Sequence, residues 1–158
     1  MNDILITYQS QKEDKYFDRK SAKIEPKSII RHIVAFANAE GGTLVIGIED
    51  NGDITGFKYQ GAKNIGDYEE AIYSLTHPNP IFRLDKMSVT NVNNEEDVIL
   101  AIEIEPSHKR IVKAQNGDVY LRMGDNNIVF RTLRTAERVN RVTLKLWTLL
   151  LFQDQKGK

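Results

Sequence analysis

The chain contains no cysteine and has no long apolar stretch, although it is 158 residues long. Without cysteine, a disulfide framework, a thiolate nucleophile and a cysteine-ligated zinc site are all excluded. The longest apolar run, at residues 149–152, is far too short to cross a bilayer. Residues 1–15 lack the basic and apolar regions of a secretory signal. We therefore expect a cytoplasmic protein without membrane contact.

The length and composition indicate one ordinary globular domain. A chain of 158 residues can bury most of its surface without disulfides or metals. Hydrophobic residues make up 41% of the sequence and charged residues 28%, as is typical of globular proteins. No internal repeat or linker is visible, so we predict a single domain over residues 1–158, in which residues 1–12 form a peripheral N-terminal segment.

The net charge of zero hides an asymmetry along the chain. Residues 1–106 carry 11 Lys and Arg against 18 Asp and Glu, whereas residues 107–158 carry 11 against 4. These two parts must lie close together in one small domain. Either they compensate each other's charge, alone or with a partner subunit, or the basic part faces a polyanion such as nucleic acid.

The clearest structural pattern is a helix followed by a buried strand. Residues 27–39 are predicted to form a core-facing helix, because apolar residues recur at helical spacing. The Gly-Gly pair at 41–42 permits a turn into residues 43–48, whose continuous apolar run is typical of a strand covered on both faces. An acidic turn at residues 49–53 then leads into a hairpin with residues 54–56. The apolar stripe of the helix is Ile30, Ile33, Val34 and Ala37.

The remaining patterns predict strands interleaved with a few helices. This arrangement indicates an α+β fold, with a mixed, largely antiparallel sheet and about three helices packed on it. The further predicted elements are strands at 16–20, 83–92 and 98–105, a helix at 61–76, a hairpin of 111–114 with 119–122, and a last helix at 135–151.

Basic residues gather in the C-terminal third of the chain. Residues three and four positions apart share one face of a helix, and such a face either contacts phosphates, is solvated, or packs against the acidic part. Arginines and a lysine with this spacing in and before the last helix are Arg131, Arg134, Arg138, Arg141 and Lys145. The strands and loops before it add Lys109, Arg110, Lys113 and Arg122.

Carboxylates lie near the ends of predicted strands. Glu13 and Asp18 precede and occupy the first strand, and Asp50 follows the buried strand at 43–48. Neighbouring strand ends can bring carboxylates together to hold a hard divalent cation, although carboxylates in turns are more often solvated. Lys20 shares the predicted strand face of Asp18, so it is placed to position a phosphate.

Two other chemistries find little support in the sequence. The segment Asp50-Asn51-Gly52 matches the Asp-x-Gly-x-Gly segment of histidine-kinase and gyrase ATPases only in part, because Asp53 and Ile54 stand where a second glycine is needed. A Gly-x-x-x-x-Gly-Lys-Ser/Thr phosphate loop is absent. A hydrolase triad is not expected either, because no histidine accompanies a Gly-x-Ser-x-Gly segment. The three histidines are His32, His77 and His108.

The string FANAEGGTLVIGIEDNGDITG, residues 36–56, resembles the central motif of the Schlafen-type AlbA-like domain. That family has Ala-Phe-Ala-Asn, then Gly-Gly-x-Leu, a strand ending in Gly-Val/Ile-x-Asp, and a glycine turn. Its upstream Glu-Phe-Lys is replaced here by Asp18-Arg19-Lys20. Its downstream Tyr-x-Arg-x-Gly-Ser is matched by residues 120–124, with Asp125 in place of the serine. The resemblance extends over roughly residues 13–140.

The resemblance implies a compact α+β domain associated with nucleic acid, which in bacteria and archaea forms part of transcriptional regulators. In some animal members, the related domain is a metal-dependent RNA endonuclease that uses three acidic residues. By position, these acids fall on Glu13, Asp18 and Asp50. The five-residue spacing of the first two is kept, but Asp18 is one methylene shorter than the family's glutamate.

We therefore predict a domain that binds DNA or RNA without a cofactor. Its phosphate contacts are expected from Lys20, Arg122 and the basic C-terminal helix and loops. The enzyme alternative is an endoribonuclease in which Glu13, Asp18 and Asp50 hold Mg²⁺ or Mn²⁺ and activate water. A third interpretation is a protein–protein interaction domain with no nucleic-acid role. We also expect that the chain can form a homo-oligomer.

Overall fold

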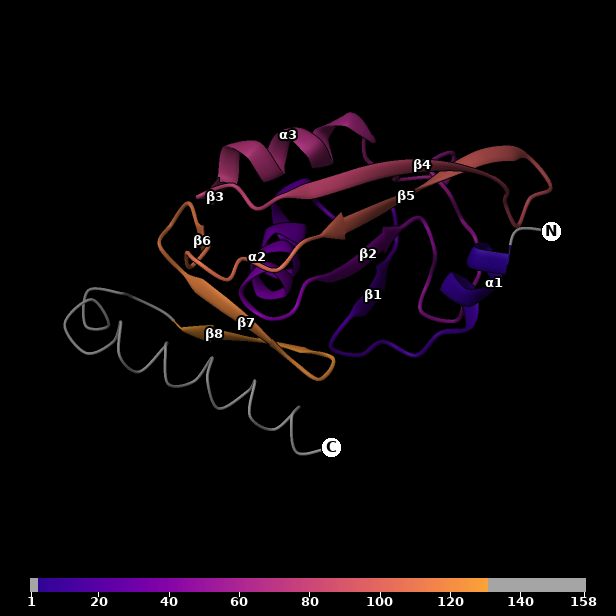
Figure 1. Cartoon of the computed structure of the whole chain (residues 1–158). Helices are drawn as coiled ribbons and strands as arrows, with labels where there is room; N and C mark the ends of the chain where they lie inside the picture. The colour runs from indigo at the N-terminus through magenta and orange to yellow at the C-terminus, as the bar shows by residue number, and fades with distance from the viewer. Residues whose placement is uncertain (1–2, 131–158) are drawn as a thin grey trace.

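A four-stranded sheet lies at the centre of the computed structural model, which describes residues 3–130 (Figure 1). Its strand order is β1-β2-β5-β4, with β1 parallel to β2 and the other neighbours antiparallel. The predicted mixed, mostly antiparallel sheet is therefore confirmed. The strands are β1 (Phe17–Lys20), β2 (Gly42–Ile46), β4 (Phe82–Thr90) and β5 (Glu96–Ile104).

Within residues 3–130, three α-helices accompany the sheet, so the α+β class is confirmed as well. They are α1 (Asp3–Ser10), α2 (Ile30–Asn38) and α3 (Gly66–Leu75). A 3₁₀ turn, η1 (Pro26–Ile29), leads directly into α2, and proline suits this first turn because its missing N–H would have no helical partner. Together, η1 and α2 connect the parallel strands β1 and β2, since parallel neighbours need a crossover.

Both faces of the sheet are buried, which explains the continuous apolar run in β2. Leu44 and Ile46 pack in a core with α2 and α3, whereas Val45 between them packs in a second core on the other face. Successive strand residues point to opposite faces, so a strand that is covered on both sides needs no polar alternation. Ile102 and Ile99 of β5 divide between the two cores in the same way.

The Gly-Gly turn ends α2 as the sequence indicates. Gly41 has a φ of +76°, and its N–H donates to the Phe36 carbonyl at 2.8 Å. A left-handed residue just after a helix satisfies one of its last carbonyls and turns the chain back, and glycine adopts this conformation without steric cost. The turn aims the chain into β2, so that β2 lies directly beside β1.

Helix α1 is absent from the sequence-based prediction, which treats residues 1–12 as peripheral. Tyr8 is buried, and its ring stacks on Phe17 with 5.8 Å between centroids. The Arg19 guanidinium donates to the backbone carbonyls of Tyr8, Gln9 and Gln11 at the end of this helix. A cation at a helix C-terminus is favourable, so Arg19 fixes α1 against the sheet.

The predicted hairpin between residues 111–114 and 119–122 is wrong. Instead, β6 (Lys113–Ala114) pairs with β3 (Thr76–His77), and β7 (Val119–Met123) pairs with β8 (Asn126–Phe130). The predicted return strand at 54–56 is reduced to one bridge between Ile48 and Ile54. The predicted helix at 61–76 begins at Gly66, and the predicted last helix at 135–151 lies outside the described residues.

Within residues 3–130, no helix is long and apolar enough to cross a membrane.

Asp97, at the start of β5, fixes the loop that follows the Ile48–Ile54 bridge. Its carboxylate accepts hydrogen bonds from the backbone N–H groups of Phe57 and Lys58 at 3.0 and 3.1 Å, and from the Asn91 side chain at 3.0 Å. Burial would raise the pKa of Asp97, but these hydrogen bonds lower it below the ordinary value. Gly56 packs directly against this carboxylate, with no room for a Cβ atom.

Replacing Gly56 should therefore destabilise the fold. Gly56 has a φ of +67°, so Gly56→Ala adds both backbone strain and a collision with Asp97. We expect a loss of about 1–3 kcal/mol in the free energy of unfolding, measured by urea denaturation. Gly66→Ala is the matched control, because the nearest atom to its new Cβ lies 3.6 Å away. Equal effects of the two substitutions would contradict this account.

Candidate nucleic-acid interface

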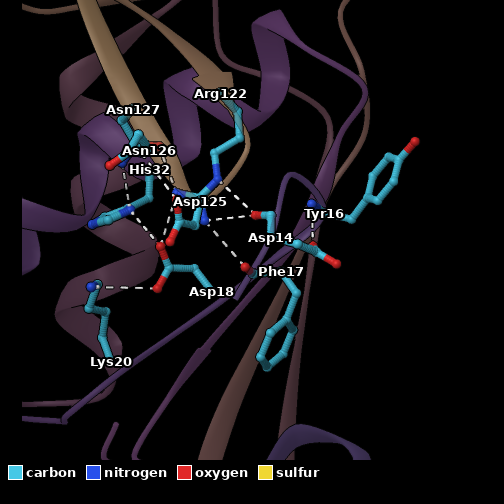
Figure 2. A network of polar contacts seen from close by, with 10 residues as sticks. All are labelled: Asp14, Tyr16, Phe17, Asp18, Lys20, His32, Arg122, Asp125, Asn126 and Asn127. Atoms are coloured by element: carbon cyan, nitrogen blue, oxygen red, sulfur yellow. Dashed lines mark hydrogen bonds and ion pairs between the residues drawn. The ribbon is translucent and has the colours of Figure 1, made fainter. Parts of the chain in front are cut away.

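Arg122 of β7 lies at the centre of a buried polar network (Figure 2). The hairpin of β7 and β8 packs on α2, which directs the Arg122 side chain toward β1. Nε and Nη2 both donate to the Asp14 carbonyl, and Nη2 also donates to the Phe17 carbonyl. Nη1 donates to Asp18 at 3.0 Å and to Asn127 at 2.9 Å. All five N–H groups are thus used within the protein.

Asp18 is the anionic partner of Arg122 and is 2% exposed. It lies opposite Leu44 in the β1–β2 register and therefore points to the face that α2 covers. Its Oδ2 is 3.4 Å from Nδ1 of His32, which α2 supplies, and its Oδ1 is 3.5 Å from Nζ of Lys20. Strand β1, helix α2 and the β7–β8 hairpin consequently meet at a single carboxylate.

The charge state of the network follows from its burial and its cations. Burial would raise the pKa of Asp18, but His32, Lys20 and Arg122 lower it well below the ordinary value, so Asp18 is ionised. Burial also lowers the pKa of His32, although Asp18 opposes this, so the ring is neutral at pH 7. Because a neutral ring carries no charge, Arg122 and Lys20 supply the positive charge that balances Asp18.

Asn127 of β8 connects Arg122 to His32. Arg122 donates to the Asn127 Oδ1, so the amide NH₂ faces Nδ1 of His32 at 2.8 Å. The Asp18 Oδ2 lies 3.4 Å from the same nitrogen, so Asn127 and Asp18 both approach Nδ1 of His32. Within the described part of the chain, Nε2 is buried and has no hydrogen-bond partner, and neither have Asp18 Oδ1 and Arg19 Nε. Sequence reasoning missed His32 and Asn127, because only the fold brings them to Asp18.

The acidic residues predicted for a metal site are only partly brought together. Burial and the Asp18 carboxylate raise the pKa of Glu13 above its ordinary value, whereas Lys20 opposes this, so the Glu13 and Asp18 carboxylates are neighbours. Asp50 lies on the exposed turn after Ile48. Over residues 3–130, no group of three His, Asp or Glu side chains could hold a metal ion.

The described side chains therefore do not fit a Mg²⁺ or Mn²⁺ centre. A hard divalent cation needs carboxylate oxygens that are free to coordinate it. The Asp18 carboxylate already contacts Arg122 and Lys20, and Asp50 is not gathered with Glu13 and Asp18. The acidic-triad hypothesis stays a prediction, and only its Glu13–Asp18 half is present as a close pair.

The basic residues predicted for nucleic-acid contact lie in different surroundings. Lys109 and Arg110 are exposed on the connection between β5 and β6, and Lys113 of β6 is half-buried. The Lys20 side chain is 27% exposed beside Asp18. Arg122 is buried and has no N–H left for a phosphate, so its role in this fold is structural. The predicted contacts Arg131, Arg134, Arg138 and Arg141 lie outside the described residues.

The connection that carries Lys109 and Arg110, here called the basic loop (residues 107–113), is anchored on α2. The Ser107 N–H donates to the Ala37 carbonyl at 2.7 Å, and the Ser107 hydroxyl donates to the Arg110 carbonyl. At the other end, the Val112 N–H donates to the Asn38 side chain at 2.8 Å. The loop is thus attached at both ends to the end of α2, with the Lys109 and Arg110 side chains exposed to solvent.

The chain is similar to known proteins in both sequence and fold. A family model described as Schlafen, AlbA_2 matches residues 13–131, which is most of the sequence. The chain is also similar to a crystal structure of the DIP2311 protein from Corynebacterium diphtheriae, with a TM-score of 0.52 and 19% sequence identity over 73% of this chain. It spans only 22% of that protein, so this similarity concerns the fold alone. No curated protein sequence matches.

Removing the Arg122 charge should destabilise the protein strongly. Arg122→Gln removes the cation that donates to the buried Asp18 at 3.0 Å, and breaking a buried ion pair costs about 3–5 kcal/mol. Arg83→Gln is the matched control, because it breaks the exposed Arg83–Glu103 pair, which contributes at most about 1 kcal/mol. Urea denaturation measures both. Adding Asp18→Asn to Arg122→Gln removes the unpaired charge and should recover part of the lost free energy of unfolding. If it does not, the loss is not caused by the buried charge of Asp18.

Replacing Glu13 should raise stability at neutral pH. The pKa of Glu13 is higher in the fold than in the unfolded chain, where it is about 4.3, so the fold favours the protonated form. Glu13 therefore contributes to stability below about pH 4.3, and this contribution is lost as the pH rises through the folded pKa. Gln imitates the protonated form at every pH. We therefore expect Glu13→Gln to increase the free energy of unfolding at pH 7 and to change it little near pH 4.

Glu25→Gln provides a control of opposite sign. A hydrogen bond and the charge of Lys63 lower the pKa of Glu25, so this ionised carboxylate is favoured in the fold. Its replacement should slightly decrease stability at pH 7. Urea denaturation at both pH values compares the two variants, and a loss of stability for Glu13→Gln at pH 7 would show that its contact with Asp18 is not repulsive.

Proposed function

The chain belongs to the Schlafen AlbA_2 family, and from this premise we propose that it binds nucleic acid through the phosphate backbone. The observation that carries this proposal is the basic loop. Lys109 and Arg110 are exposed there, and neither forms an ion pair with any carboxylate of residues 3–130. Because these cations have no carboxylate partner in the described structure, they are better suited to bind an external polyanion than to compensate the acidic part of the chain.

The basic loop suits phosphate contacts because its backbone is already fixed. Hydrogen bonds from Ser107 to Ala37 and from Val112 to Asn38 hold its two ends, so less backbone entropy is lost on binding. Lysine and arginine on such a loop can neutralise phosphates, which releases counterions from the nucleic acid. These phosphate contacts do not depend on the base sequence. The proposal is therefore a domain of a DNA- or RNA-binding protein, such as a transcriptional regulator, that binds without a cofactor.

The other two interpretations stay predictions with less support from the geometry. Cleavage of RNA by Glu13, Asp18 and Asp50 with Mg²⁺ or Mn²⁺ would need an acidic group that residues 3–130 do not form. A protein–protein interaction domain would use the same charges on a partner subunit, in a homo-oligomer or with another protein. Nothing in the geometry favours either one over nucleic-acid binding.

The salt dependence of binding tests the proposal. The double variant Lys109→Gln/Arg110→Gln should weaken binding to mixed-sequence DNA and RNA. It should also reduce the slope of log K against log salt by about 0.9 for each duplex-DNA phosphate that is no longer neutralised. Fluorescence anisotropy between about 50 and 200 mM salt measures this. We expect a reduction of about 1–2 for the pair.

The matched control is the double variant Lys58→Gln/Lys86→Gln, which removes two exposed lysines that do not belong to the basic loop. Its slope should stay close to that of the parent. Equal slopes for both double variants would place the phosphate contacts elsewhere. A negligible signal for the parent at low salt would overturn nucleic-acid binding and leave the protein-interaction alternative.

A further inference from the structure

A groove of about 430 Å³ opens where η1, α2 and the end of α3 meet β6 and β7. The same elements lie together around α2 in Figure 1. Its volume is within the range of small-molecule sites and is sufficient for a nucleotide unit. The residues that matter for its chemistry are Lys27, Ile30, Arg31, Leu75, Gln115 and Tyr120.

One wall of the groove is cationic. Lys27 and Arg31 are four residues apart, one turn along η1 and α2, and both are exposed. In the described part of the chain, neither forms an ion pair. The carboxylate of Asp118, in the turn beside the groove, accepts a hydrogen bond from the Asn116 side chain at 3.0 Å and so already has a partner. This wall is therefore complementary to an anion.

A second wall of the groove is apolar and aromatic. Tyr120 is two residues before Arg122 on β7, so it shares the strand face that packs on α2. It is only partly buried, where it packs against the core that contains Ile30. Leu75, at the end of α3, packs against the same core. An aromatic ring beside aliphatic side chains is a surface on which a nucleobase can stack.

Hydrogen bonds hold the two walls in place. The Asn38 side chain donates to the carbonyls of Val112 and Tyr120 at 2.8 and 2.9 Å, which attaches β7 to α2. The Gln115 N–H donates to the Leu75 carbonyl at 2.9 Å, which attaches the turn after β6 to the end of α3. The groove is consequently formed before a ligand arrives, and little ordering is needed on binding.

We propose that this groove binds one nucleotide of a single-stranded nucleic acid, with its base against Tyr120 and its phosphate on Lys27 and Arg31. The proposal rests on the proposed function and adds the form of nucleic acid to it. A base in a duplex is stacked between its neighbours, so its face cannot reach a protein ring without unstacking. Stacking on an aromatic ring accepts every base, which agrees with binding that does not depend on sequence.

The experiment compares an oligonucleotide of about eight nucleotides with a blunt duplex of the same sequence, both fluorescently labelled. Tyr120→Leu keeps an apolar side chain but removes the ring, and Arg31→Gln removes a phosphate contact. We expect each to weaken single-strand binding by about tenfold and duplex binding far less. Tyr120→Phe, which keeps the ring, should bind like the parent, and so should the control Lys86→Gln on β4, which does not line the groove.

A second readout reports stacking directly. An oligonucleotide that contains 2-aminopurine loses fluorescence when that base stacks on an aromatic ring, so the parent and Tyr120→Phe should quench it and Tyr120→Leu should not. Thermal melting establishes that each variant folds. If Tyr120→Leu is unfolded, two measurements still test the groove proposal. They are single-strand binding by Arg31→Gln, a substitution at an exposed residue, and the quenching of 2-aminopurine by the parent.

The two proposals fail in different ways. If single-strand and duplex binding are equal, or Arg31→Gln leaves single-strand binding unchanged, the groove proposal is overturned while nucleic-acid binding through the basic loop stands. Absence of 2-aminopurine quenching by the parent overturns it likewise. If neither nucleic acid binds the parent at low salt, both proposals are overturned.

Discussion

The ion pair between Arg122 and Asp18 is the contact on which the arrangement of the described elements depends. It joins β1 to the β7–β8 hairpin, and through His32 and Asn127 it includes α2 as well. A buried charge is costly unless it is paired, so separating the hairpin from β1 would leave two uncompensated charges. Asn38, at the other end of α2, holds the same hairpin through the Tyr120 carbonyl. The motif residues around α2 therefore serve mainly to position the C-terminal strands.

Local patterns in the sequence were sufficient for the central part of the fold. The helical stripe from Ile30 to Ala37 and the unbroken apolar run of β2 each depend on neighbours within a few residues, and both predictions were confirmed. Helix α1 gave no such pattern, because Ile4 and Ile6 are more than 40% exposed and only Tyr8 is buried. Its stability comes from Arg19 and Phe17, which follow it in the chain.

The site was harder to predict, because its contacts join distant parts of the chain. The Asn116-Gly117 turn suggested a hairpin, yet Ala114 pairs with Thr76 in the fold and the turn only closes on itself. Arg122 looked like a phosphate contact, because a charge in a sequence does not reveal that a carboxylate 104 residues earlier will meet it. The basic loop and the groove share α2 and Asn38, so the two candidate contacts with nucleic acid lie on one support.

The separation of 104 residues between Asp18 and Arg122 also has a consequence for how the chain is made. A ribosome releases Asp18 long before Arg122, at about 5–20 residues per second. During those seconds, β1 can pair with β2, but the Asp18 oxygen that later meets Arg122 must stay hydrated, because Arg122 has not yet been synthesised. Closure of the loop between them is slow for the same reason, since contacts far apart in sequence form late. Folding of this domain is therefore expected to finish after translation of β8 rather than strand by strand.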